Sequence, residues 1–91
     1  MIPGDRRLRA FTAGMADNKL YLIDPQRGTA TPVYDFSPYA VPGTAIWPQL
    51  FRINHDGMRL FITLNYVGNA GKVLQLDISR PEHPKVLDVV I

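Results

Sequence analysis

Two histidines are the residues in this sequence best suited to bind a metal ion. His55 and His83 lie in separate segments of the chain, and each has an acidic neighbour, Asp56 or Glu82. A protein metal site with histidine ligands normally adds a third histidine or a carboxylate close by. Because both histidines fall in polar segments that look like turns, the sequence favours solvent-exposed turn residues, and we predict no metal ligand.

Four aspartates, Asp24, Asp35, Asp77 and Asp88, recur near the predicted ends of strands. A pair of carboxylates can carry out general acid–base catalysis. An aspartate at the end of a strand can also accept hydrogen bonds from the free N–H groups of the following turn. We predict turn capping for these residues and no catalytic role.

Other catalytic and cofactor signals are missing from the sequence. Ser37 and Ser79 lack the flanking glycines of a nucleophile elbow. Residues 68–71, Gly-Asn-Ala-Gly, lack the lysine and the following helix of a phosphate-binding loop. There is no cysteine, which excludes thiol catalysis, disulfides and cysteine-ligated metals. The nine aromatic residues are spread through strands and turns, as core packing requires and a base-stacking platform does not.

The composition is that of an ordinary globular protein. The chain has 91 residues, 46% of them hydrophobic and 20% charged, and a net charge of +2. This length fits at most one domain of marginal stability. Arg6, Arg7 and Arg9 form one basic cluster, which we interpret as a solvated end and not as a nucleic-acid arm. No apolar run reaches the length of a membrane helix, and no signal peptide is visible, so the localisation stays open.

Strand signals dominate the chain, and no segment has helical periodicity with caps. The turn at 24–28 and the turn at 55–57 each end in a glycine, which accepts the positive φ of a tight hairpin. Pro32 cannot donate to a ladder and predicts an edge strand or a bulge. We therefore predict an all-β fold of antiparallel sheets. Its strands are 8–14, 19–24, 29–36, 48–54, 58–64, 72–78 and 85–91.

The pattern divides into two units. Residues 1–36 form the first, the turn-rich segment 37–47 is a linker, and residues 48–91 form the second. Segment 65–71, with its glycines and asparagines, is predicted to be a loop. The sequence stops at Ile91 inside the last predicted strand, which indicates a repeat protein cut short and an edge strand ready to pair.

The two units resemble each other. Residues 9–13 correspond to 59–63, 20–25 to 73–78, and 33–35 to 87–89, at a nearly constant spacing along the chain. A repeat of about 50 residues with several strands and no helix has the size of a propeller blade. Two unrelated hairpins with an aspartate at a strand end would give a similar match, and this alternative stays open. Alternation predicts six buried side chains: Leu20, Leu22, Leu60, Ile62, Leu74 and Leu76.

Two segments resemble the selenium-binding protein (methanethiol oxidase) family of β-propellers. Residues 77–85, Asp-Ile-Ser-Arg-Pro-Glu-His-Pro-Lys, look like its D-I-S-x-P-x-x-P-K turn. Pro48-Gln49 followed by residues 56–63 is similar to its P-Q and D-G-x-R-L-Y-V-T strand pair. The resemblance implies a seven-bladed propeller of several hundred residues, of which this chain would supply about two blades.

The family's enzymes are understood to use histidines for a metal, with copper the expected ion, and a redox-active cysteine motif. This chain has no cysteine, and His55 and His83 match no family ligand position. No catalytic, cofactor or metal residue is therefore carried over.

We predict a non-catalytic partial β-propeller module with a structural or protein-interaction role. It would self-associate or join further propeller blades, without a cofactor, a nucleic acid or a membrane. The alternative is a fragment of a selenium-binding protein-like, metal-dependent oxidoreductase. A third possibility is a small ligand-binding β-sandwich.

Overall fold

The computed structural model describes residues 2–14, 17–39, 46–66 and 69–89. Within these ranges the chain forms strands and one short 3-10 helix, η1 (Ser37–Tyr39), and none of its helices could cross a membrane. The strands are β1 (Ala10–Gly14), β2 (Lys19–Asp24), β3 (Thr29–Asp35), β4 (Ile46–Ile53), β5 (Arg59–Tyr66), β6 (Asn69–Asp77) and β7 (Lys85–Val89).

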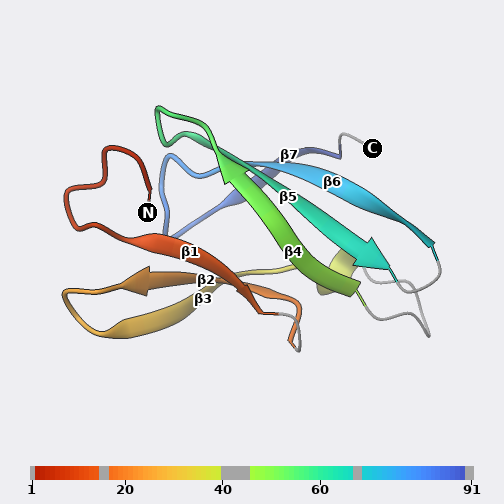
Figure 1. Ribbon diagram of the computed structural model, residues 1–91, viewed down its shortest axis with the longest axis horizontal. Coiled ribbons are helices and arrows are strands. Elements are labelled where there is room, and N and C mark those ends of the chain that lie inside the picture. Colours follow the sequence, from red (N-terminus) through yellow and green to blue (C-terminus); the bar gives the residue numbers. More distant parts are fainter. Residues whose placement is uncertain (1, 15–16, 40–45, 67–68, 90–91) are drawn as a thin grey trace.

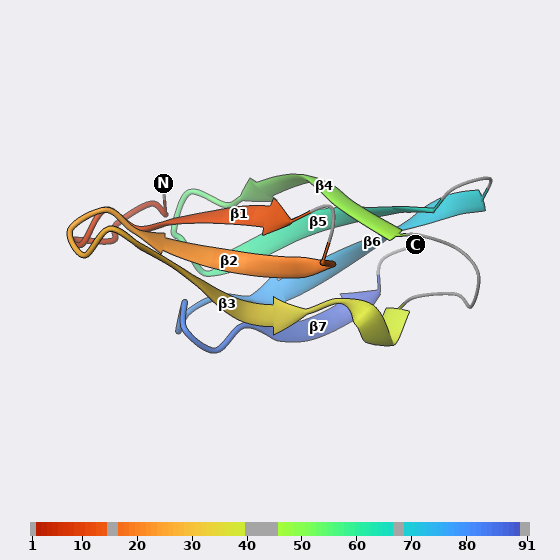
Figure 2. The ribbon, with the colours of Figure 1, turned by 90° about the horizontal axis from the view of Figure 1, so that it is seen from below.

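The strands build two antiparallel sheets, so the predicted all-β fold is confirmed. One sheet has the order β1-β2-β3 and the other the order β4-β5-β6-β7. We call them the first sheet and the second sheet. Figures 1 and 2 show them as two layers, with the first sheet over one face of the second. The first sheet lies within residues 1–36, and the second begins at Ile46, just before the predicted unit 48–91.

Both predicted glycine turns have the expected backbone. Gly28 has φ of 65°, and Gly57 has φ of 74°. The Asp56 carboxylate accepts a hydrogen bond from the Met58 N–H at 2.9 Å and tightens the β4–β5 turn. A Cβ atom at Gly57 would lie 2.5 Å from the carbonyl oxygen of Pro3, so this position needs glycine for space as well as for φ.

Pro32 lies where its missing N–H does least harm. Its strand, β3, is at the edge of the first sheet, and the β2–β3 ladder has an irregularity between Leu20 and Tyr21, next to the pairing with Pro32. The prediction of an edge strand or a bulge is confirmed on both counts.

The core lies between the two sheets. All six side chains predicted to be buried are buried, and five of them have no exposed surface. Phe11 and Phe36 from the first sheet and its following turn join the same cluster as Leu64 and Ile78 from the second. Each sheet thus covers one face of the other, and burial of this apolar surface is the main stabilising term of the fold.

The prediction of a loop over residues 65–71 was wrong at 65–66 and 69–71, and residues 67 and 68 lie outside the described residues. β5 continues to Tyr66, β6 begins at Asn69, and these two residues pair with each other. Asparagine and glycine have low strand propensity, but ladder pairing with a neighbouring strand overrides it. Of the predicted linker 37–47, Ser37–Tyr39 is η1 and the last two residues belong to β4. Residues 40–45 and the predicted strand end at Ile91 lie outside the described residues.

Candidate functional site

The two histidines occupy separate turns. His55 is exposed in the β4–β5 turn, and His83 is exposed in the β6–β7 turn. In the part of the chain that the structure describes, no group of three or more histidines and acidic residues could hold a metal ion. The geometry therefore brings no ligand set together around either histidine.

Three of the four aspartates cap turns as predicted. Asp24 Oδ1 accepts hydrogen bonds from the N–H groups of Gln26 and Arg27, at 3.1 and 3.3 Å. Asp35 and Asp77 each accept one from the N–H two residues ahead, at 2.8 and 2.9 Å. Hydrogen bonds from Ser37 lower the pKa of Asp35, and hydrogen bonds from Ser79 lower the pKa of Asp77. Asp88 instead lies inside β7, opposite Gln75.

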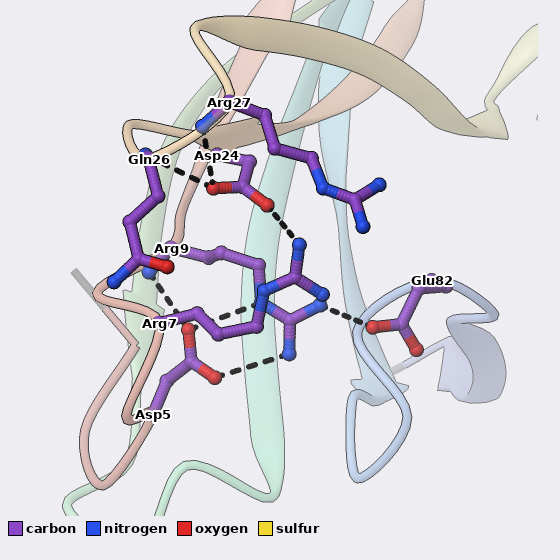
Figure 3. A network of polar contacts seen from close by, with 7 residues as sticks. All are labelled: Asp5, Arg7, Arg9, Asp24, Gln26, Arg27 and Glu82. Atoms are coloured by element: carbon purple, nitrogen blue, oxygen red, sulfur yellow. Dashed lines mark hydrogen bonds and ion pairs between the residues drawn. The ribbon is translucent and has the colours of Figure 1, made fainter.

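The densest group of polar side chains is an ion-pair cluster between the N-terminal segment, the first sheet and the β6–β7 turn. Its ion-paired members are Asp5, Arg7, Arg9, Asp24 and Glu82, and the Arg27 backbone N–H donates to Asp24 beside them (Figure 3). Arg9 is the centre of the cluster and is only 8% exposed. Its Nη2 and Nε donate to the two carboxylate oxygens of Asp5, at 3.0 and 3.1 Å, and its Nη1 donates to Glu82.

The interpretation of the three arginines as a solvated end was wrong for Arg9 and incomplete for Arg7. Arg6 is exposed, but Arg7 pairs with the buried carboxylate of Asp24. The turn over residues 2–9 causes this difference, because the N–H of Ile2 donates to the carbonyl of Arg9 at 2.8 Å and folds the segment back. That turn places Asp5 beside Arg9, and sheet packing brings Glu82 to the other side.

A cavity of about 330 Å³ lies beside the cluster. Arg7, Arg9, Arg27, Asp24 and Glu82 line it together with apolar residues such as Leu22 and Val33. His83 also reaches this cavity. The five ion-paired side chains comprise two cations and three anions, and Arg27 in the lining adds a third cation, so the formal charges cancel.

The electrostatics of the cluster favour a structural role. Hydrogen bonds from the Arg9 side chain lower the pKa of Asp5 and the pKa of Glu82, while the bond to Asp5 raises the pKa of Arg9. Asp5 and Glu82 therefore stay ionised at neutral pH, and neither can donate a proton as a general acid. The bidentate Arg9–Asp5 pair ties the N-terminal turn to β1, and Glu82 ties the second sheet to both.

The stability of the protein should fall when the pH drops below about 5. The pKa values of Asp5 and Glu82 lie below their ordinary values of 3.8 and 4.5. A lowered pKa in the folded state adds stability above the ordinary pKa, and this stability is lost as the pH falls through the folded value. Urea denaturation between pH 6 and pH 3 would measure it. The double variant Asp5→Asn/Glu82→Gln should show a flatter profile, and an equally steep one would contradict the assignment.

The remaining candidates fit structural roles. Ser37 and Ser79 donate backbone hydrogen bonds to the capping aspartates. Tyr34 packs against Phe36 with ring centroids 5.0 Å apart, and burial, with a smaller contribution from Tyr39, raises the pKa of Tyr34 to about 12. Its hydroxyl therefore stays protonated at neutral pH. Gly68 and the side chains of Trp47, Phe51 and Tyr66 lie outside the description.

Comparison with known proteins adds no relative: no family model matches the chain, and neither a curated protein nor a solved structure matches it. The ion-pair cluster was missed from the sequence because Arg9 and Glu82 are 73 residues apart. The one local signal was the spacing of four residues between Asp5 and Arg9.

Proposed function

We propose that this chain is a non-catalytic interaction module whose two sheets are successive β-propeller-like units, and that it assembles with further units of the same kind. The proposal rests on one observation. The two sheets cover only one face of each other, and large apolar side chains stay exposed elsewhere. They are Leu8, Met58, Phe61, Leu87 and Val89, each between 37% and 54% exposed.

The ladder register supports the proposed repeat. Ala10 pairs with Ile23 in the first sheet, and Leu60 pairs with Leu76 in the second. The sequence match relates the same positions, because it aligns Ala10 with Leu60 and Ile23 with Leu76. By this criterion β1 and β2 are the equivalents of β5 and β6.

The last strand of each unit does not follow the sequence match. The match of residues 33–35 with 87–89, extended back along the strand, makes His83 the equivalent of Thr29. In the ladders, Asp24 pairs with Thr29 and Asp77 pairs with Lys85, so Lys85 is the equivalent residue. The longer β6–β7 turn accounts for this shift.

The resemblance to selenium-binding proteins is consistent with blade-like units but transfers no catalytic residue to this chain. β3 and β7 are edge strands, and Leu87 and Val89 lie exposed on β7. Exposed apolar residues on an edge strand are a common site of association. A closed ring of three or four chains would supply six or eight such units, within the range of about four to eight blades in propellers.

The test is the solution mass of the purified chain at micromolar concentration, measured by light scattering. We expect a mass of several chains, because two units alone leave apolar surface uncovered and about three repeats are normally needed for stability. A well-folded monomer would contradict the proposal and favour a self-contained sandwich.

A further inference from the structure

The outer face of the second sheet shares three residues with the inner face of the first at equivalent positions. The pairs Ala10–Ile23 and Leu60–Leu76 align β1 with β5 and β2 with β6. In this alignment four positions hold identical residues in both sheets. One is Lys19 and Lys72. The other three, which alternation places on the inner face of the first sheet and the outer face of the second, are Arg9 and Arg59, Phe11 and Phe61, and Asp24 and Asp77.

These equivalent residues differ in burial. Phe11 is 6% exposed and Phe61 is 37% exposed. The side chain of Arg9 is 10% exposed and that of Arg59 is 38% exposed. The side chain of Asp24 is 8% exposed, whereas that of Asp77 is 31% exposed and lies 3.8 Å from Arg59. The arginine, phenylalanine and aspartate are thus buried in the first sheet and more exposed in the second.

The difference in burial between these equivalent residues shows which face of each sheet meets the other. If two equivalent sheets packed symmetrically, Phe11 and Phe61 would both lie in the core. Instead, the second sheet turns Leu60 and Ile62 inward, and their equivalents in the first sheet, Ala10 and Thr12, lie on the uncovered side. The contact between the sheets is therefore head to tail, with unlike faces meeting. A head-to-tail contact leaves the outer face of the first sheet and the outer face of the second sheet uncovered. These are equivalent to the two faces that meet inside the chain, so they complement each other.

The two unused faces have suitable compositions. We call the Phe61 side of the second sheet the Phe61 face, which also holds Gln75 opposite Phe61. The uncovered side of the first sheet, the Ile23 face, holds Ile23, Tyr21, Ala30 and Pro32. Ile23 and Tyr21 are half-buried, whereas Ala30 and Pro32 are exposed. The short side chains of Ala30 and Pro32 on the Ile23 face leave room for a phenylalanine to pack beside Ile23.

We propose that the Phe61 face of one chain binds the Ile23 face of a second copy, in the head-to-tail arrangement of the two sheets within one chain. This inference rests on the proposed function and specifies its interface. A second copy is the occupant because its Ile23 face is equivalent to the inner face of the second sheet, which holds Leu60 and already shares the core cluster with Phe11. Repetition of this contact either closes a ring or continues as an open filament.

The test uses one variant for each face, Ile23→Arg and Phe61→Arg, with His55→Arg in an exposed turn as the matched control. Sedimentation velocity at micromolar concentration measures the mass. We expect each face variant alone to be a monomer and their equimolar mixture to form a dimer, because the mixture keeps one intact Phe61 face and one intact Ile23 face. The control should associate like the unaltered chain.

Three outcomes would overturn this interface. If either face variant alone still forms dimers, the chains associate through like faces or through another surface such as the β7 edge, and the head-to-tail contact is wrong, although self-association stands. If the mixture stays monomeric, these faces do not bind each other. If the unaltered chain is a monomer, the proposed function fails as well. Circular dichroism checks folding, and Ala30→Arg and Gln75→Arg on the same two faces replace any variant that unfolds.

Discussion

Replacing Leu74 by alanine should lower the free energy of unfolding by about 2–5 kcal/mol, the usual result of a large-to-small change in a core. The Leu74 side chain has no exposed surface and lies on the inner face of the second sheet. Leu22, on the inner face of the first sheet, is 6% exposed and should give a loss in the same range. Urea denaturation followed by circular dichroism would measure both.

The matched control is Leu87→Ala, because Leu87 is 49% exposed on the edge strand β7 and its truncation should change stability by about 0.5 kcal/mol or less. Since both sheets contribute to one core cluster, each core variant should shift a single unfolding transition. Two separate transitions would mean that residues 1–36 and 48–91 unfold independently. A loss below about 0.5 kcal/mol at both core sites would contradict the burial that alternation predicts.

Much of the fold could be predicted because its signals are local. Alternation in β2 and β6 identified the buried leucines, and Asp-Gly and Arg-Gly identified the hairpin turns with positive φ. Pro32 identified an edge strand from the chemistry of one residue. The loop prediction at residues 65–71 failed because the signal that decides the structure there is not local. Asn69 belongs to a strand because Tyr66 pairs with it, and pairing between strands is not a property of a segment alone.

The site was harder to predict, because long-range packing creates it. Asp24 could be identified as a capping residue, yet nothing near it in the sequence shows that Arg7 binds its second oxygen. Similarly, the match of Phe11 with Phe61 could be found by comparing the two units, but their opposite burial could not. That difference depends on which face of each sheet meets the other.

Replacing Arg9 by methionine should destabilise the protein by about 3 kcal/mol, at the low end of the range for removing one partner of a buried ion pair. Methionine keeps much of the apolar stem but removes the donors to Asp5 and Glu82. The Asp5 side chain, 11% exposed, would then keep the Arg9 backbone N–H, at 2.7 Å, as a donor but lose the charge that balances it. Glu82 is half exposed and can regain water, which limits the loss.

The matched control is Arg6→Met, since Arg6 is exposed and surface substitutions usually change stability by about 0.5 kcal/mol or less. The double variant Arg9→Met/Asp5→Leu removes both charges, so it should be less destabilised than the sum of the two single variants. Urea denaturation of all four variants and the unaltered chain at pH 7 supplies the values. Equal losses for Arg9→Met and Arg6→Met, with additive single variants, would show that Arg9 contributes no more than a surface charge. The link from the N-terminal turn through Arg9 to the β6–β7 turn would then be unimportant for stability.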